Sequence, residues 1–436
     1  MLVSVIPDSS SKVDLGKYMI KKDLLDNGLT VVTEAMPHVR SVAVGIWLRR
    51  GSRHEQRVKG GISHFIEHMV FKGTTRRTQV EIAQEMDAIG GQTDAFTSKE
   101  YASFNAKVLD EHVPQVVDLL ADIVLNPSFD PEELERERKV IFEEIKMVED
   151  TPDDLVHEIF LESFWPDHPL GLPILGTEET VAALDRDQIL RFFRETYTPA
   201  NLIVSAAGNL DHEKVVDLVD SHFRPLQPSP NGVYESPPLV DPAICFREKD
   251  LEQVHLVLGT VAPHQSHADR YTCYVLNTIL GGTMSSRLFQ VIREKRGLAY
   301  SVYSGLSCYR DAGNLTIYAA TSPKTSAQVV DLVLEELRRI RREPVGDKEL
   351  RRAKDHLKGS IMLGLEGTGS RMSQLAQHEM YFGRQISLDE TLAAIENVNR
   401  EEIMRLAGEL FEERPLGLTA VGNLAELRPR PEQLVA

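Results

Sequence analysis

SAAGNL at residues 205–210 returns as TAVGNL at residues 419–424, late in each half of the chain. Two further pairs match in the same order: VVDLL from Val116 with VVDLV from Val329, and PEELERERK from Pro131 with GDKELRRAK from Gly346. The offsets all lie between 213 and 216 residues. Three ordered matches at nearly constant offset indicate an internal duplication. We therefore expect two homologous halves.

A proline-rich segment separates these halves. Residues 225–242 read PLQPSPNGVYESPPLVDP and hold six prolines, which neither a helix nor an inner strand tolerates. Such composition is typical of an exposed linker between domains. The sequence predicts a first domain at 1–224, a linker at 225–243 and a second domain at 244–436.

Within the first half, strands and helices are grouped rather than strictly alternating. This grouping favours the α+β class, with an antiparallel sheet and helices packed on it in each half. The hydrophobic periodicity predicts strands at 29–36, 41–49, 92–97, 102–109 and 201–207, and helices at 60–72, 78–89, 111–125 and 131–148.

One of these helices carries the residues best suited to bind a metal. Residues 61–70 read GISHFIEHMV, and their apolar members form one stripe that would face the core. His64 and His68 lie one turn apart on another face, with Glu67 beside them. Two imidazoles at this spacing can hold Zn²⁺, and a neighbouring carboxylate can polarise a water there. The alternative is a solvated polar helix face that happens to carry two histidines.

A zinc ion needs a third ligand, which the helix at 131–148 can supply. Glu137 and Glu144 are seven residues apart and fall on the apolar stripe of that helix, whereas Glu143 is rotated away by about 100°. A carboxylate among core residues is costly unless it meets a cation or donors. Glu144 as ligand and Glu137 as its supporting partner would satisfy that demand. The alternative is that both are exposed and the stripe is misplaced.

The second half serves as an internal control. Aligning the copies places Cys273, Leu276 and Asn277 opposite His64, Glu67 and His68. Ala353 and Ser360 stand opposite Glu137 and Glu144. Every proposed metal or catalytic residue is thus replaced in the second copy. Building the fold does not require these residues, which favours a functional interpretation and predicts one metal site per chain.

The stretch GGISHFIEHMVFKGT, residues 60–74, resembles the signature of the pitrilysin/insulinase family of inverted-motif zinc peptidases. Chain length, duplication and the segment ERERKVIFEEIKMVEDTP at 135–152 most resemble the beta subunit of mitochondrial processing peptidase and its bacterial homologues. The resemblance implies one Zn²⁺ per chain, held by His64, His68 and Glu144. It also implies catalytic roles for Glu67 and Glu137.

The resemblance extends to residues that would bind the substrate. IREKRGLAYSVYS, residues 292–304, resembles the segment in which Arg293 and Tyr300 would hold the substrate carbonyl and stabilise an oxyanion. GGQTDAFTSKE, residues 90–100, matches the edge strand on which substrate backbone would pair. The residues implied there are Thr93, Ala95 and Thr97; Asp94 departs from the Asn common in the family. The alternatives are that Arg293 is a surface cation, that Tyr300 is a strand aromatic and that residues 90–100 form an ordinary hairpin strand.

These features predict a zinc-dependent endopeptidase for extended peptides or unstructured segments such as presequences. The alternative is a non-catalytic homologue of the processing peptidase that serves a structural or partner-binding role. Because the motif is intact, we expect a homodimer with two active sites. A heterodimer with an inactive sister chain is the competing arrangement.

Composition and charge limit the partners and the cellular compartment that we expect for this chain. A net charge of -17 argues against general affinity for nucleic acid or anionic membranes. No apolar run approaches the ~18 residues that span a bilayer. Residues 1–16 resemble neither a secretory nor a transit segment, so we expect the bacterial cytoplasm. The three cysteines, Cys245, Cys273 and Cys308, are predicted to be reduced core residues.

Overall fold

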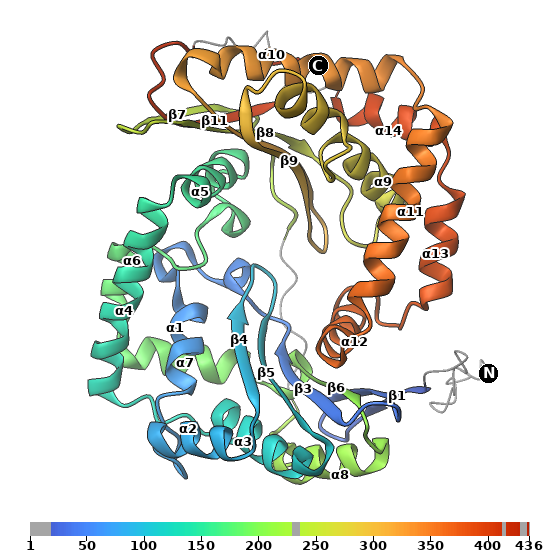
Figure 1. The fold of residues 1–436 in the computed structure, drawn as a ribbon. Coiled ribbons are helices and arrows are strands. Elements are labelled where there is room, and N and C mark those ends of the chain that lie inside the picture. Colours follow the sequence, from blue (N-terminus) through green and yellow to red (C-terminus); the bar gives the residue numbers. More distant parts are fainter. Residues whose placement is uncertain (1–18, 229–235, 412–415, 428–433, 436) are drawn as a thin grey trace, which may run out of the picture.

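The computed structural model describes residues 19–228, 236–411, 416–427 and 434–435, which form two lobes (Figure 1). Each lobe is a β-sheet with helices packed on it, so the predicted α+β class with two homologous halves is confirmed. The N-terminal lobe precedes the linker and the C-terminal lobe begins with Ile244. Residues 236–243 form neither helix nor strand, and linker residues 229–235 lie outside the described residues.

The sheet of the N-terminal lobe has six strands in the order β1-β2-β6-β3-β5-β4. Neighbours are antiparallel, as expected, except for the parallel pair β2–β6. Strand β4 is an edge, so its outer backbone groups have no strand partner among the described residues. The strands are β1 (Met19–Leu24), β2 (Thr30–Ala35), β3 (Ser41–Leu48), β4 (Gln92–Thr97), β5 (Ala102–Leu109) and β6 (Leu202–Gly208).

The C-terminal sheet repeats this order with one strand fewer, as β7-β11-β8-β10-β9. Its parallel pair, β7–β11, occupies the place of β2–β6, and its edge strand β9 occupies the place of β4. The duplication seen in the sequence is therefore a duplication of topology. The strands are β7 (Ile244–Glu248), β8 (Val254–Val261), β9 (Ala299–Cys308), β10 (Gly313–Thr321) and β11 (Gly417–Gly422).

Helices cover one face of each sheet and bury the main core of their own lobe. In the N-terminal lobe they are α1 (Ile62–Val70), α2 (Gln79–Ala88), α3 (Val113–Leu125), α4 (Pro131–Asp150), α6 (Glu178–Ala183), α7 (Arg186–Thr196) and α8 (His212–Phe223). In the C-terminal lobe they are α9 (Arg270–Leu280), α10 (Ser326–Arg342), α11 (Asp347–Gly364), α13 (Leu388–Asn397) and α14 (Arg400–Phe411).

Each lobe also lends one helix to the other. Helix α5 (Pro152–Phe164) belongs to the N-terminal half but packs against β8, β10 and β11 of the opposite sheet. Helix α12 (Thr368–Phe382) reciprocates by packing on β2, β3 and β6. The two helices begin 216 residues apart, so they are equivalent copies. The exchange closes the second face of both sheets and fixes the lobes to each other.

A buried ion cluster joins the hairpin tips of the two lobes. Arg53 is 3% exposed and donates to Glu100 and to Asp311, each at 2.7 Å. Glu100 lies between β4 and β5, and Asp311 lies between β9 and β10. The backbone N–H of Arg310 also donates to Glu100, at 3.0 Å. The edge strands β4 and β9 are thereby held at a fixed separation.

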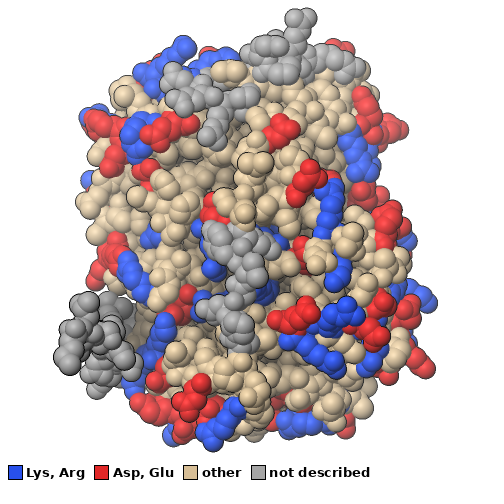
Figure 2. All heavy atoms as spheres, turned by 180° about the vertical axis from the view of Figure 1, so that it is seen from behind, with Lys and Arg blue, Asp and Glu red and all other residues tan. Residues whose placement is uncertain are grey.

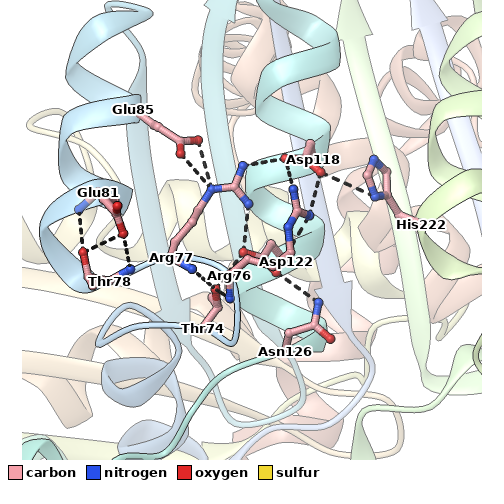
Figure 3. A network of polar contacts seen from close by, with 10 residues as sticks. All are labelled: Thr74, Arg76, Arg77, Thr78, Glu81, Glu85, Asp118, Asp122, Asn126 and His222. Carbon is pink, nitrogen blue, oxygen red and sulfur yellow. Dashed lines mark hydrogen bonds and ion pairs between the residues drawn. The ribbon is translucent and has the colours of Figure 1, made fainter.

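The loop that follows α1 is anchored by a polar network (Figure 3). Asp122 of α3 is 1% exposed and accepts hydrogen bonds from Thr74 at 2.7 Å and from Arg77 at 2.8 Å. Arg77 also reaches Glu85 of α2 at 3.0 Å and Asp118 of α3. A buried carboxylate of this kind is tolerated because cations and donors surround it. The network ties the loop between α1 and α2 to helix α3.

The cysteine prediction was wrong for two of three residues. Cys273 is buried in α9, whereas Cys245 and Cys308 are partly exposed, and all three are free. Cys245 lies on the edge strand β7 and Cys308 ends the edge strand β9, where the sheet provides less cover. The expectation of no disulfide among them agrees with the structure.

The surface carries both signs of charge. On the face shown in Figure 2, acidic and basic side chains are interspersed, and no broad basic patch gathers among the described residues there. Among the helices that the structure describes, none combines the length and apolarity that crossing a membrane requires.

Candidate metal centre in the inter-lobe cleft

Helix α1 presents both histidines on the face opposite its core stripe. Ile62, Phe65 and Ile66 are fully buried in the lobe core, which fixes the rotation of the helix. His64 and His68 then lie side by side, with 3.3 Å between their Nε2 atoms. The four-residue spacing read from the sequence thus brings the two ring nitrogens together.

Glu144 of α4 completes a triangle with these two nitrogens. Its Oε2 lies 3.6 Å from Nε2 of His64 and 3.5 Å from Nε2 of His68. Zinc–ligand distances of ~2.0–2.1 Å with tetrahedral angles separate ligand atoms by about 3.4 Å, so the three donors fit such an ion. Oε2 of Glu144 is buried and accepts no hydrogen bond from any described residue. Within the described part of the chain, these residues are the single group of three with metal-binding spacing.

The electrostatics favour neutral imidazole at this position. Burial, assisted by the neighbouring His68, lowers the pKa of His64 to about 3. A neutral ring keeps a lone pair on Nε2, which a metal ligand needs. Deprotonated histidine and a carboxylate form the donor set that zinc accepts.

Glu137 supports His68 from behind. Its Oε2 lies 2.9 Å from Nδ1 of His68, and Lys72 donates to its other oxygen at 2.7 Å. Burial alone would raise the pKa of Glu137, yet the hydrogen bonds from Lys72 and His68 leave that pKa below its usual value. A carboxylate on Nδ1 fixes the ring orientation and leaves Nε2 free to bind a metal. The structure therefore places Glu137 behind His68, in contact with His68 and Lys72 and outside the lining of the cleft.

Glu67 faces the cleft beside the ligand triangle. With His64 and Thr97 it lines a cavity of about 680 Å³. Its Oε2 is buried without a hydrogen-bond partner among the described residues. Burial raises the pKa of Glu67 and the Glu144 charge adds to the shift, while Thr97 and His68 oppose it. A carboxylate with one unpaired oxygen and a raised pKa is suited to accept and return a proton.

The two lobes share the walls of this cleft. Phe96 and Thr97 of β4, together with Glu158 of α5, line it from the N-terminal half. Tyr303 of β9 and Thr316 of β10 line it from the C-terminal half. A ligand beside Glu67 would therefore contact both halves at once.

The predicted substrate residues divide into two groups. Thr97 lines the cleft, whereas Thr93 and Ala95 lie further along β4 and are not among its lining residues. Neither Arg293 nor Tyr300 belongs to the described lining either. The Arg293 guanidinium packs 4.7 Å from the ring centroid of Tyr300, and Tyr300 is 78% exposed at the start of β9. The structure pairs these two with each other, outside the lining of this cleft.

Sequence reasoning missed two residues that support the site. Lys72, which holds Glu137, stands four residues after His68 and could have been found from helical spacing. Glu55 accepts two backbone N–H groups at the start of α1. It lies in an irregular segment, where no periodicity relates sequence position to spatial position.

Two lobes of one topology, with a His–His–Glu cluster at the cleft between them, define a bilobal protein with a candidate metal centre. Residues 30–178 match the model of Insulinase (Peptidase family M16), and residues 183–357 match that of the Peptidase M16 inactive domain. The chain belongs to the insulinase family, peptidase family M16. The family resemblance that the motif carried is confirmed.

Relatives span nearly the whole chain. A Bacillus subtilis protein named uncharacterized zinc protease YmxG is 44% identical over 91% of this chain and 96% of its own length. A Mycobacterium leprae protein, also named an uncharacterized zinc protease, is 42% identical over 94% and 93%. A Helicobacter pylori protease of known structure superposes with a TM-score of 0.86 at 22% identity, covering 93% of this chain and 99% of its own. That last likeness shows a shared fold.

Proposed function

We propose that this chain is a zinc-dependent endopeptidase with the inverted motif His64, Glu67, His68. The observation that carries the proposal is the ligand triangle of 3.3 to 3.6 Å, beside which Glu67 holds a buried carboxylate oxygen without a hydrogen-bond partner among the described residues. His64, His68 and Glu144 would hold the ion. Relatives named zinc proteases support the choice of metal. When bound, zinc would supply Lewis-acid chemistry to the carbonyl under attack.

The residues of the chain would perform the remaining work. Glu67 would take a proton from the attacking water and return it to the leaving amine, as expected of a general base next to a scissile bond. Glu137 and Lys72 would hold the His68 ring in place. The open edge of β4 would pair with the backbone of an extended substrate, so side-chain selectivity would be loose. Extended peptides and unstructured segments, including presequences, are the substrate class that such an edge accepts.

Arg293 and Tyr300 remain predicted donors to the substrate carbonyl. Tyr300 is highly exposed and its partner Arg293 lies against it, so neither side chain is locked into the protein core. Exchange of either residue should raise KM or lower kcat without changing zinc content. Unchanged values of both constants for Arg293→Ala and Tyr300→Phe would remove them from the mechanism.

The decisive experiment replaces Glu67 with glutamine. Zinc content should stay at one per chain, while cleavage of a quenched-peptide mixture should fall by about 10²- to 10⁴-fold. Glu143→Gln is the matched control, because Glu143 adjoins Glu144 on α4 but points into solvent with 74% exposure. If Glu67→Gln protein cleaves peptides like the wild type, or wild-type protein neither binds zinc nor cleaves, the proposal fails. Where the wild type does cleave, mass-spectrometric mapping of the cuts would define its sequence preference.

We further propose that two copies of the chain assemble, each with a complete site. Because one chain already carries all the metal-binding and catalytic residues named above, a homodimer needs no sister chain. The heterodimer with an inactive sister remains the competing arrangement. Size-exclusion chromatography with light scattering on the single purified chain separates them. The two relatives named above are bacterial proteins, which supports a bacterial setting, and cell fractionation tests the proposed cytoplasmic location.

A further inference from the structure

Helix α1 begins at a position that cannot supply its own cap. The N-cap residue is Gly61, whose φ of 91° is a left-handed conformation that side chains disfavour. A Cβ at Gly61 would also lie 2.5 Å from the carbonyl oxygen of Leu175. Serine, threonine, aspartate and asparagine, the usual N-cap residues, are therefore excluded. The free N–H groups of the first turn need an acceptor from elsewhere.

Glu55 provides that acceptor from six residues upstream. Its Oε2 accepts from the backbone N–H of Gly61 and its Oε1 from the N–H of Ser63, both at 2.8 Å. The side chain is 5% exposed. Burial raises the pKa of Glu55 to about 7, against the hydrogen bonds from Ser63 and Gly61 and the nearby Lys99 cation, which lower it. The two backbone donors and Lys99 offset only part of the cost of burying this carboxylate.

The turn that Glu55 fixes is the turn that carries His64. His64 is the third residue of α1, so its backbone lies in the first turn. That end of a helix carries about +0.5 of an elementary charge, which disfavours a cation held nearby. A negative carboxylate at the helix N-terminus opposes that partial charge. Glu55 is thus placed to affect both the position of His64 and the local potential.

We propose that Glu55 is a positioning residue of the metal centre, which holds the first turn of α1 and offsets its positive end so that His64 can bind a divalent cation. The inference rests on the metal site of the proposed function. It adds a residue that touches neither metal nor substrate and acts through the backbone of Gly61 and Ser63.

The test measures zinc affinity of the full chain by competition with a chromogenic chelator. Glu55→Gln keeps the shape but removes the charge and one acceptor, so zinc should bind about ten-fold more weakly, within the range for supporting residues of metal sites. The visible absorption spectrum of the Co²⁺-substituted protein should change too, because it reports ligand geometry. Glu81→Gln is the matched control: Glu81 accepts from the N–H of Thr78 at the start of α2, away from the metal centre.

The outcomes separate this inference from the proposed function. Wild-type protein without zinc binding would defeat the proposed function itself. Wild-type binding together with unchanged affinity and Co²⁺ spectrum in Glu55→Gln would overturn only the role of Glu55, as would an equal loss in Glu81→Gln. If Glu55→Gln protein does not fold, Glu55→Asp replaces it, since the shorter carboxylate keeps its charge but cannot span both N–H groups. A smaller loss of affinity there supports the role, and wild-type affinity refutes it.

Discussion

Replacing Gly259 with alanine should loosen the docking of the two lobes. Gly259 lies on β8 where the borrowed helix α5 presses Phe160 against the sheet. An added Cβ would lie within 3.1 Å of three atoms of the Phe160 ring. The added Cβ would lie 2.9 Å from Cε2 and closer still to Cζ, whereas ordinary van der Waals contact begins near 3.4 Å. Phe160 is 1% exposed and stacks on Phe164 at 5.1 Å, so its ring has no room to retreat.

The expected cost follows from this crowding. Overpacking a well-filled core costs about 1–3 kcal/mol. Removing glycine from a strand returns roughly 0.5–1 kcal/mol through the unfolded chain. The net loss for Gly259→Ala should lie between about 0 and 2.5 kcal/mol by these two terms. Gly305→Ala on β9 is the control, because its Cβ would meet nothing nearer than Thr316 at 3.8 Å.

Fluorescence can report this interface selectively. The chain has two tryptophans: Trp47 lies in the cluster under α12, and Trp165 in the cluster under α5. Urea unfolding of a Trp47→Phe background therefore follows the α5 interface through Trp165. Adding Phe160→Leu should relieve the clash, so the double variant should be more stable than the summed losses by about 0.5–3 kcal/mol. Additivity within about 0.5 kcal/mol would refute the packing argument.

Three further predictions follow from other sites. Arg77→Ala should cost about 3–5 kcal/mol because buried Asp122 loses its nearest cation, at 2.8 Å (Figure 3). Arg76 is half-exposed and lies 3.9 Å from Asp122, so Arg76→Ala should cost under ~1 kcal/mol; equal shifts in denaturant midpoint would contradict this. Burial lowers the pKa of His378 to about 4 in the folded protein, below its usual value of ~6.5. The free energy of unfolding should therefore hold above pH ~6.5 and fall as the pH drops toward 4. In chelator-treated protein, His378→Asn should flatten that fall. Free zinc at 1,000 times Kd should stabilise the wild type by about 4 kcal/mol, and Glu144→Gln should abolish most of that shift in thermal unfolding.

Local patterns gave the metal centre because its residues belong to two regular helices. The four-residue spacing of His64 and His68 sets their common face without any tertiary information. The apolar stripe of α4 likewise placed Glu137 and Glu144 on its inner side and Glu143 outside, as the structure has them. The periodicity of each helix does not show that α1 and α4 pack against each other, so their contact had to come from the structure.

The sequence could not reveal the exchanged helices. Pro152 marks the start of α5 directly after α4 ends at Asp150, but nothing local distinguishes a helix that covers its own sheet from one that covers the other. The available signal is indirect. Gly45 on β3 and Gly259 on β8 occupy equivalent strands, and in each case a Cβ would strike a side chain of the borrowed helix, Met372 or Phe160. Only the assembled fold explains why both positions are glycine.

The exchange also explains how one half can lose its metal residues and still be needed. With α12 removed, Trp47 and its neighbours on the N-terminal sheet would face water. With α5 removed, the C-terminal sheet would do the same. Each lobe therefore completes the core of the other, and the second copy could exchange His64 and His68 for Cys273 and Asn277 without losing that role. One candidate metal cluster per chain is consistent with this arrangement, because both lobes line the cleft beside it.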